Sequence, residues 1–386
     1  MEQILEKNKC TGCSACMNIC PKSCIEMTRD EEGFEYPVIN QDACVDCKLC
    51  QKTCPIINRW NMVDVYDEPE IYAAWSPNIA IRLESTSGGI FTELARGILA
   101  EGGYVCGARY NENFGVEHFI INDEEGLNAL RQSKYVQSRV GYIYRDIEKL
   151  LKEDKKVMFV GSPCEVAGLA SFLKKDYENL VLVDFVCRGT NSPKAYESYI
   201  TFIEKKYKSK IKRVWFKNKK YGWNRFATRI ELENGKVYTK DRYSDCYMRG
   251  YLERNLFIRP SCETCNFKEI PRKSDISLAD FWGIGKYDRA LDTDQGTSLV
   301  FINSSRGKSC FVNILHNIIY KREKLEHALE GNGCILNSVK LNSRRETFYK
   351  ALNEKDFYEA IKPFLKRGKR ESLGVIKKKI KRALKI

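Results

Sequence analysis

The sequence lacks the marks of exported, membrane-spanning and fibrous proteins. Its first ten residues contain no apolar stretch typical of a secretory signal. No run in the 386 residues approaches the roughly 18 apolar residues that a spanning helix needs. Only 10 Pro and 25 Gly are present, and 43% of the residues are hydrophobic, which excludes a collagen-like or disordered chain. We therefore expect a cytoplasmic globular protein of two or three structural units.

The basic residues are concentrated at the C-terminus, although the net charge of the chain is +14. Residues 366–386 contain ten Lys/Arg and one acid, Glu371, so a net +9 of that charge lies in the tail. A nucleic-acid-binding protein is expected to spread basic residues over a folded face, so no nucleic-acid partner is predicted. Val375–Ile386 has the spacing of a basic amphipathic helix, which predicts peripheral association with an anionic inner membrane face. A solvated basic terminus is the alternative.

Cysteine is abundant, with 17 residues, and without an export signal cysteines are more typical of metal ligands than of disulfides. Eight of them form two runs with the spacing C-x2-C-x2-C-x3-C-P in the first 55 residues. A [4Fe–4S] cluster needs four thiolates around one small volume, and in such runs the fourth cysteine ligates the other cluster. The predicted ligand sets are Cys10, Cys13, Cys16 and Cys54 for the first cluster, and Cys20, Cys44, Cys47 and Cys50 for the second.

Zinc is the alternative for these runs, but zinc sites use two C-x2-C pairs or a Cys/His mixture. Two identical four-cysteine runs, each followed by proline, favour a ferredoxin-type module with two clusters. Cys24 lies outside the pattern and is interpreted as a small buried hydrophobic residue.

From Ile71 onward the pattern is typical of an α/β fold. The order strand, helix, strand within residues 157–186 predicts a parallel βαβ unit. The turn Asn234-Gly235 predicts a β-hairpin region at residues 214–240. Strands are also predicted at residues 104–110 and 275–279, and helices at residues 90–99, 146–151 and 195–206.

We expect an α+β and α/β chain in which a bacterial-ferredoxin-like domain precedes an α/β domain and a helical C-terminal segment. The predicted units are a ferredoxin domain (1–57), a linker (58–70), an α/β domain (71–310, with parts meeting near residue 150), a helical segment (311–365) and the basic tail (366–386).

Four further cysteines lie where ligands usually bind. Cys164 and Cys187 follow two strands that are predicted to be parallel neighbours, so both are expected at the carboxyl edge of the sheet. Cys262 and Cys265 form a later C-x2-C pair. Together these four suit a third [4Fe–4S] cluster or zinc, whereas four separately buried cysteines are the alternative. Cys106, Cys246, Cys310 and Cys334 are interpreted as structural.

The chain resembles the coenzyme F420 hydrogenase/dehydrogenase beta subunit family. The matching stretches, in the order of the family, are Ser85–Tyr110, Ser133–Ser138, Val157–Leu169, Val183–Gly189 and Arg259–Gly283. The resemblance implies FAD beside a [4Fe–4S] cluster, held here by Cys164, Cys187, Cys262 and Cys265. It also implies electron transfer between clusters and a two-electron acceptor, which in well-known members is coenzyme F420. Where relatives commonly have Cys-His-Gly, this chain has Cys187-Arg188-Gly189, and Thr190-Asn191 replaces a more usual Val-Pro. Arg binds anions well but does not serve as a base near neutral pH.

Two glycine-containing runs are candidates for binding the flavin phosphates. Ser87, Gly88 and Gly89 precede a predicted helix, where free N–H groups favour a phosphate. Gly161, Ser162 and Pro163 lie at the turn after a predicted parallel strand. Ordinary helix capping is the alternative for both runs, because neither is a full dinucleotide fingerprint. Asp280 and Trp282 are candidates to contact the flavin ring. The alternative is that Asp280 is a helix cap and Trp282 is a core aromatic residue.

The resulting hypothesis is an iron–sulfur flavoprotein oxidoreductase in which electrons pass between the clusters and FAD, and then to or from a small-molecule substrate or coenzyme. A redox partner protein or a soluble ferredoxin is expected to exchange electrons with the clusters, at the end of the path opposite the substrate. One alternative is an electron-transfer subunit without a substrate of its own. Another is a non-catalytic iron–sulfur protein in bacterial surface-polysaccharide assembly.

Overall fold

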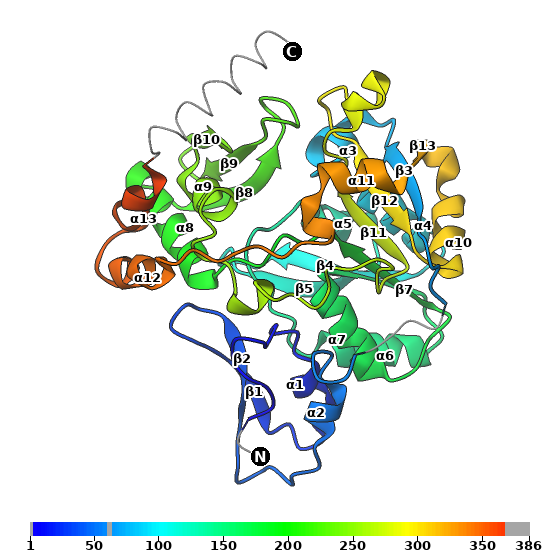
Figure 1. Ribbon diagram of the computed structural model, residues 1–386, viewed down its shortest axis with the longest axis horizontal. Coiled ribbons are helices and arrows are strands. Elements are labelled where there is room, and N and C mark those ends of the chain that lie inside the picture. The colour runs from blue at the N-terminus through cyan, green and yellow to red at the C-terminus, as the bar shows by residue number, and fades with distance from the viewer. Residues whose placement is uncertain (1–2, 60–63, 367–386) are drawn as a thin grey trace.

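The computed structural model describes residues 3–59 and 64–366 of the chain (Figure 1). A ferredoxin-like module at the N-terminus lies against a large mixed sheet that carries helices on both faces. A small antiparallel sheet with its own helices lies beside the large sheet. This mixed α/β architecture with a ferredoxin-like N-terminal region confirms the predicted fold class.

The ferredoxin-like module repeats one local structure for each cysteine run. In each run the residue before the short helix, Ser14 or Lys48, has a left-handed backbone with φ of 61° or 58°. In each run the residue that ends the helix, Cys20 or Cys54, returns to an extended backbone before its proline. The same spacing therefore produces the same turn twice. The elements are α1 (Ala15–Ile19), β1 (Ile25–Arg29), β2 (Glu35–Ile39), antiparallel to β1, and α2 (Leu49–Thr53).

The large sheet has the strand order β13-β3-β12-β11-β7-β6-β4-β5. β4, β6, β7 and β11 run parallel to one another, and the other pairs are antiparallel. The strands are β3 (Glu70–Trp75), β4 (Tyr104–Tyr110), β5 (Val116–Ile121), β6 (Val157–Gly161), β7 (Leu180–Phe185), β11 (Ile276–Asp280), β12 (Ser298–Ile302) and β13 (Ile319–Glu323). The helices are α3 (Ile79–Glu84), α4 (Ile90–Ala100), α5 (Glu124–Leu130), α6 (Ile143–Lys152), α7 (Pro163–Leu173), α10 (Ser305–Asn313) and α11 (Leu325–Gly331).

The central strands are buried on both faces, which explains their continuous apolar sequences. In β7, Val181 and Val183 pack into the core beneath α4 and α10. Leu180 and Leu182 point to the opposite face and pack with α6 and α7. Successive residues of a strand alternate between faces, so a strand between two helical layers has no polar side. The predicted parallel pair of β6 and β7 is present, with Val157 opposite Leu180.

The small sheet has the order β10-β9-β8 and is covered by helices from two distant parts of the chain. Gly235, with φ of 79°, forms the turn between β9 and β10, where the sequence predicts it. The elements are α8 (Pro193–Tyr207), β8 (Ile211–Asn218), β9 (Ala227–Leu232), β10 (Val237–Asp241), α9 (Cys246–Leu252), α12 (Arg345–Glu354) and α13 (Phe357–Leu365).

The C-terminal segment differs in one respect from the helical unit predicted at residues 311–365. Residues 319–323 form β13, which pairs with β3 at the edge of the large sheet, while α12 and α13 pack with the small sheet. Most side chains of β13 are exposed, so the strand lacks the alternation that identifies strands from sequence. The tail beyond Lys366, with its predicted membrane association, lies outside the described residues. None of the described helices is long and apolar enough to cross a membrane.

Candidate functional site

The two cysteine runs of the ferredoxin-like module lie close together and share cysteines between their sites. Burial, together with the neighbouring thiols of Cys54 and Cys10, raises the pKa of the Cys13 thiol to about 12. Burial also raises the pKa of Cys50, and the thiols of Cys47 and Cys20 contribute in the same direction. The fourth cysteine of each run therefore lies with the first three of the other run. One cavity is lined by Cys10, Cys13, Cys16 and Cys54, and another by Cys20, Cys44, Cys47 and Cys50.

Each of these cavities has the donor set of a [4Fe–4S] cluster, which is bound by four cysteine thiolates. The raised thiol pKa values mean that without metal the buried sulfurs keep their protons, because a buried thiolate is poorly solvated. Binding of iron supplies the positive charge that a thiolate needs. In the described part of the chain, no group of three or more His, Cys, Asp or Glu side chains is arranged to hold a single metal ion.

Cys24 lies closer to the second set than its sequence position suggests. Its Sγ atom is 3.4 Å from Sγ of Cys20, and its side chain lines the second cavity. The residue is buried, as predicted, but its thiol contacts a predicted ligand and not only apolar side chains.

The third cysteine set is assembled from three separate parts of the chain. Cys164 lies in the first turn of α7, directly after β6, and Cys187 lies two residues beyond the end of β7. Cys262 ends the short 3-10 helix η1 (Pro260–Cys262), and Cys265 follows in the same loop. All four line one cavity. Burial raises the pKa of Cys187 to about 12, and the thiols of Cys262 and Cys265 act in the same direction. The structure thus brings together the four cysteines that sequence spacing and the resemblance pair.

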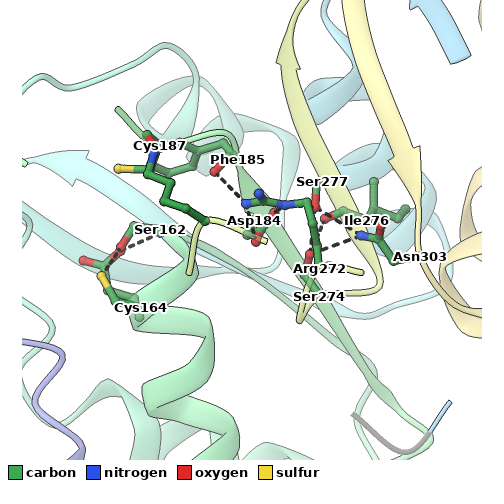
Figure 2. A network of polar contacts seen from close by, with 12 residues as sticks. Ser162, Cys164, Asp184, Phe185, Cys187, Arg272, Ser274, Ile276, Ser277 and Asn303 are labelled. Atoms are coloured by element: carbon green, nitrogen blue, oxygen red, sulfur yellow. Dashed lines mark hydrogen bonds and ion pairs between the residues drawn. The ribbon is translucent and has the colours of Figure 1, made fainter. Parts of the chain in front are cut away.

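A buried ion pair fixes the loop that carries Cys262 and Cys265 to the sheet (Figure 2). The Arg272 guanidinium donates to the Asp184 carboxylate at 2.9 Å and to Ser277 Oγ at 2.8 Å. Arg272 and Asp184 are 3% and 1% exposed. Asp184 belongs to β7, three residues before Cys187, so the ion pair ties the two halves of the third set together. Removing one partner of such a pair costs about 3–5 kcal/mol, because the other charge stays buried.

Arg188, at the position where the resemblance leads us to expect histidine, has structural partners here. Its guanidinium donates to the carbonyls of Tyr251 and Leu252 at the C-terminus of α9, and to Asn255 Oδ1 at 2.6 Å. A cation at this position stabilises the end of a helix. Lys268 also lies beside the third set, where its Nζ donates to the carbonyls of Cys187 and Cys334. The third cavity is therefore lined by cations as well as thiols.

Helix α7 connects the third set to the first. Cys164 is at the start of this helix, and Gly168 is one turn further on. A Cβ atom on Gly168 would lie 2.9 Å from Cys13 Cβ and 3.1 Å from Cys13 Sγ, so only glycine allows this approach. Four residues of an α-helix span about 6 Å, so the two thiol sets lie within about one helical turn of each other along α7.

The two runs proposed for flavin phosphates have internal hydrogen bonds in the structure. The Ser162 N–H and hydroxyl both donate to Glu165 Oε2 at 2.7 Å, which is the capping arrangement weighed as the alternative. Gly88 N–H donates to Ser298 Oγ at 2.9 Å, and a Cβ atom on Gly88 would collide with the Ala74 carbonyl. Gly89 is the residue before α4 and has a φ of 94°. Flavin binding at these runs stays a prediction.

A group of buried lysines beside Ser87, namely Lys217 and Lys219, was not identified from the sequence. Asp280 and Trp282, which contact Lys217, were predicted as flavin contacts, and this stays a prediction. Lys219 Nζ donates to the Ser87 carbonyl at 2.5 Å, and burial lowers the pKa of Lys219 to about 7. Trp282 stacks on Trp223 with ring centroids 4.5 Å apart. Asp280 accepts from Trp223 Nε1 at 2.6 Å and forms an ion pair with Lys217. The run KNKK at residues 217–220 is visible in the sequence, but no periodicity indicates that two of its lysines are buried.

Comparisons with known proteins identify two regions of the chain. Residues 154–328 match the family model for the C-terminal part of the beta subunit of coenzyme F420 hydrogenase/dehydrogenase, and residues 9–56 match the 4Fe-4S dicluster domain. An uncharacterised protein of Methanocaldococcus jannaschii is 21% identical over 345 residues, which cover 82% of this chain and 89% of that protein. An uncharacterised ferredoxin of the same organism is 38% identical over 55 residues, which cover 14% of this chain and 70% of the ferredoxin. A chain of the F420-reducing [NiFe] hydrogenase complex from Methanosarcina barkeri is 16% identical, with a TM-score of 0.46, covering 76% of this chain and 97% of that one.

Proposed function

We propose that this chain, which belongs to the coenzyme F420 hydrogenase/dehydrogenase beta subunit family and carries a 4Fe-4S dicluster domain, uses three [4Fe–4S] clusters as one electron relay to a bound flavin. The dicluster domain makes it an iron–sulfur electron-transfer protein of the oxidoreductase type. The third cluster, FAD and the direction of flow are parts of the proposal. The contact of Gly168 with Cys13 is the main support for this proposal, because that contact brings the first and third thiol sets within about one turn of α7.

The protein's part in this relay is to hold and shield the thiol sets. The clusters, when bound, supply one-electron chemistry, and FAD supplies the conversion to a two-electron transfer. Cys13 is buried and Cys164 is half-buried, and the buried Tyr144 of α6 packs against α7 beside them. Cys47 of the second set is exposed. We therefore assign the entry or exit of electrons to the second set.

The surface beside the second set supports docking of a redox partner protein. Val45, which lines the second cavity, is 59% exposed there, and Lys48 is exposed beside Cys47. Exposed apolar side chains next to a cluster loop are expected where a partner protein covers them. This observation also favours the second candidate function, an electron-transfer subunit whose substrate site lies on another chain.

For the flavin, the cation group beside Ser87 supports a site on that side of the large sheet. Arg82 and Lys219 are both buried; Lys219 donates to the Ser87 carbonyl and Arg82 donates to the Gly296 carbonyl. A flavin diphosphate is an anion and is attracted by such cations. Trp282, half-buried and stacked on Trp223, offers an aromatic face nearby.

Anaerobic purification with quantitation of iron, sulfide and flavin tests the proposal. The expected result is about twelve irons and one FAD per chain, from four irons per cluster. Cys262→Ser is expected to lower the iron content to about eight and to leave the dicluster signals unchanged. Eight irons in the parent protein would refute the third cluster. Twelve irons without flavin would favour the electron-transfer subunit over the flavoenzyme.

A further inference from the structure

Arg259 is a buried cation that joins the first and third thiol sets. It is 1% exposed and lies three residues before Cys262. Its Nε donates to the Cys10 carbonyl at 2.8 Å, so one guanidinium reaches from the loop of the third set to the loop of the first. The side chain also lines the third cavity, beside Thr11. It lines neither the cavity of the first set nor that of the second, and it reaches the first set through the Cys10 carbonyl.

The charge of Arg259 is not balanced by its hydrogen-bond partners. In the described part of the chain, its guanidinium donates to the carbonyls of Cys10 and Glu35 and to Gln137 Oε1, at 2.8–3.0 Å. All three acceptors are uncharged. The Glu35 carboxylate is paired with Arg139 at 3.5 Å and also attracts Arg259. The Tyr36 ring lies against the guanidinium with its centroid 4.2 Å away. A buried cation whose hydrogen-bond acceptors are all neutral is unfavourable, so a further anion is expected beside this guanidinium.

Four thiolates give a [4Fe–4S] site a net negative charge, and reduction adds one more negative charge. The net charge around a cluster is one of the factors that set its reduction potential. A guanidinium stays protonated at physiological pH, so its effect on the neighbouring clusters is permanent. The interaction weakens with distance, and the second set lies beyond the first.

We infer that Arg259 is a positioning residue whose charge stabilises the reduced states of both the first and the third clusters and so raises both of their reduction potentials. The part that concerns the third cluster rests on the proposed function. The part that concerns the first cluster rests on the dicluster domain alone.

Two substitutions remove this charge in different ways. Arg259→Gln deletes the cation, and Gln137→Glu places a carboxylate against it, since Gln137 Oε1 already accepts from the guanidinium at 3.0 Å. Gln137 is 8% exposed, and glutamate has the same shape, so the second variant keeps Arg259 and its contacts. Arg345→Gln is the matched control. Arg345 also ties the ferredoxin-like module to the rest of the chain, through Glu32 and the Ile258 carbonyl, but contacts no thiol loop.

The readout is a redox titration of each cluster signal by electron paramagnetic resonance, with iron content measured on the same samples. Both charge variants are expected to lower the ratio of reduced to oxidised cluster about tenfold at a fixed potential, for the first and the third clusters alike. For a one-electron couple this is a shift of about 59 mV. The second cluster and the Arg345→Gln control are expected to keep their potentials.

Unchanged potentials of the first cluster in both charge variants would overturn the inference. So would an equal shift in Arg345→Gln, because docking of the module would then account for the effect. If Arg259→Gln does not retain iron, Gln137→Glu still decides the question. Eight irons in the parent protein would refute the proposed third cluster, and the first-cluster potential would still test Arg259.

Discussion

Substitution of Gly168 by alanine tests the close approach of α7 to the first thiol set. The added Cβ would lie 2.9 Å from Cys13 Cβ and 3.0 Å from the Tyr144 hydroxyl. Neither neighbour is free to move, because Cys13 belongs to a ligand loop and Tyr144 is fully buried and donates to the Glu165 carbonyl at 2.9 Å. Overpacking of this kind costs about 1–3 kcal/mol. Alanine recovers about 1 kcal/mol of helix propensity, so a net loss of about 0–2 kcal/mol is expected.

Gly97→Ala in α4 is the matched control, because it makes the same change inside a helix without this contact. A Cβ on Gly97 would meet only Ile314 Cγ2, at 3.1 Å, so a gain of up to about 1 kcal/mol is expected. The assay is the rate at which the visible absorption of the clusters is lost in urea under anaerobic conditions. A difference of about 1.4 kcal/mol in barrier is a tenfold difference in rate. The two expected changes differ by up to about 3 kcal/mol, so we expect Gly168→Ala to lose its clusters up to about a hundredfold faster than Gly97→Ala.

Electron paramagnetic resonance of the fully reduced protein gives a second readout. Displacing α7 is expected to weaken the magnetic interaction between the first and third clusters in Gly168→Ala and to leave it unchanged in Gly97→Ala. Equal rates of cluster loss, together with an unchanged interaction, would refute the view that Gly168 sets the separation of these clusters.

Two further predictions concern single side chains. Cys24→Ala is expected to keep the full iron content, because Cys24 contacts Cys20 but lies outside the ligand pattern; loss of about four irons would make Cys24 a ligand. Burial lowers the pKa of Lys219 to about 7, so above pH 7 the empty site must take up a proton before it can attract a flavin phosphate. Flavin affinity is therefore expected to fall by up to about tenfold per pH unit between about pH 7 and 9, as measured by fluorescence titration. Lys219→Arg, which stays charged, is expected to remove this dependence, and an identical pH profile in the two proteins would contradict it.

The parallel centre of the large sheet was predictable from the sequence. β4 lies at residues 104–110, as predicted, and β6 and β7 match the apolar runs that predicted them. These strands are buried on both faces, so their hydrophobicity is continuous and easily recognised. The antiparallel strands β3, β12 and β13, which widen the sheet, were not predicted. They are short, and their pairing joins residues more than 200 positions apart, as between Ser298 and Ala74.

The candidate flavin residues show a second limit of sequence patterns. Ser162 has the signature of a phosphate-binding turn and equally that of a helix cap, and the structure uses it as a cap. Both roles use the same N–H groups and hydroxyl, so the two are separated only by the position of Glu165 in three dimensions.

The sequence by itself determined the predicted ligand sets of the ferredoxin-like module, because cluster binding within a run depends on covalent spacing along the chain. It also determined the parallel βαβ unit that places Cys164 and Cys187 at one edge of the sheet. Only the tertiary structure decided how the thiol sets lie relative to one another. The contact of Gly168 with Cys13 and the bond from Arg259 to the Cys10 carbonyl join residues more than 150 positions apart, and no local pattern encodes them. They exist because the ferredoxin-like module is packed against α7 and the Cys262 loop, and that packing is a property of the whole fold.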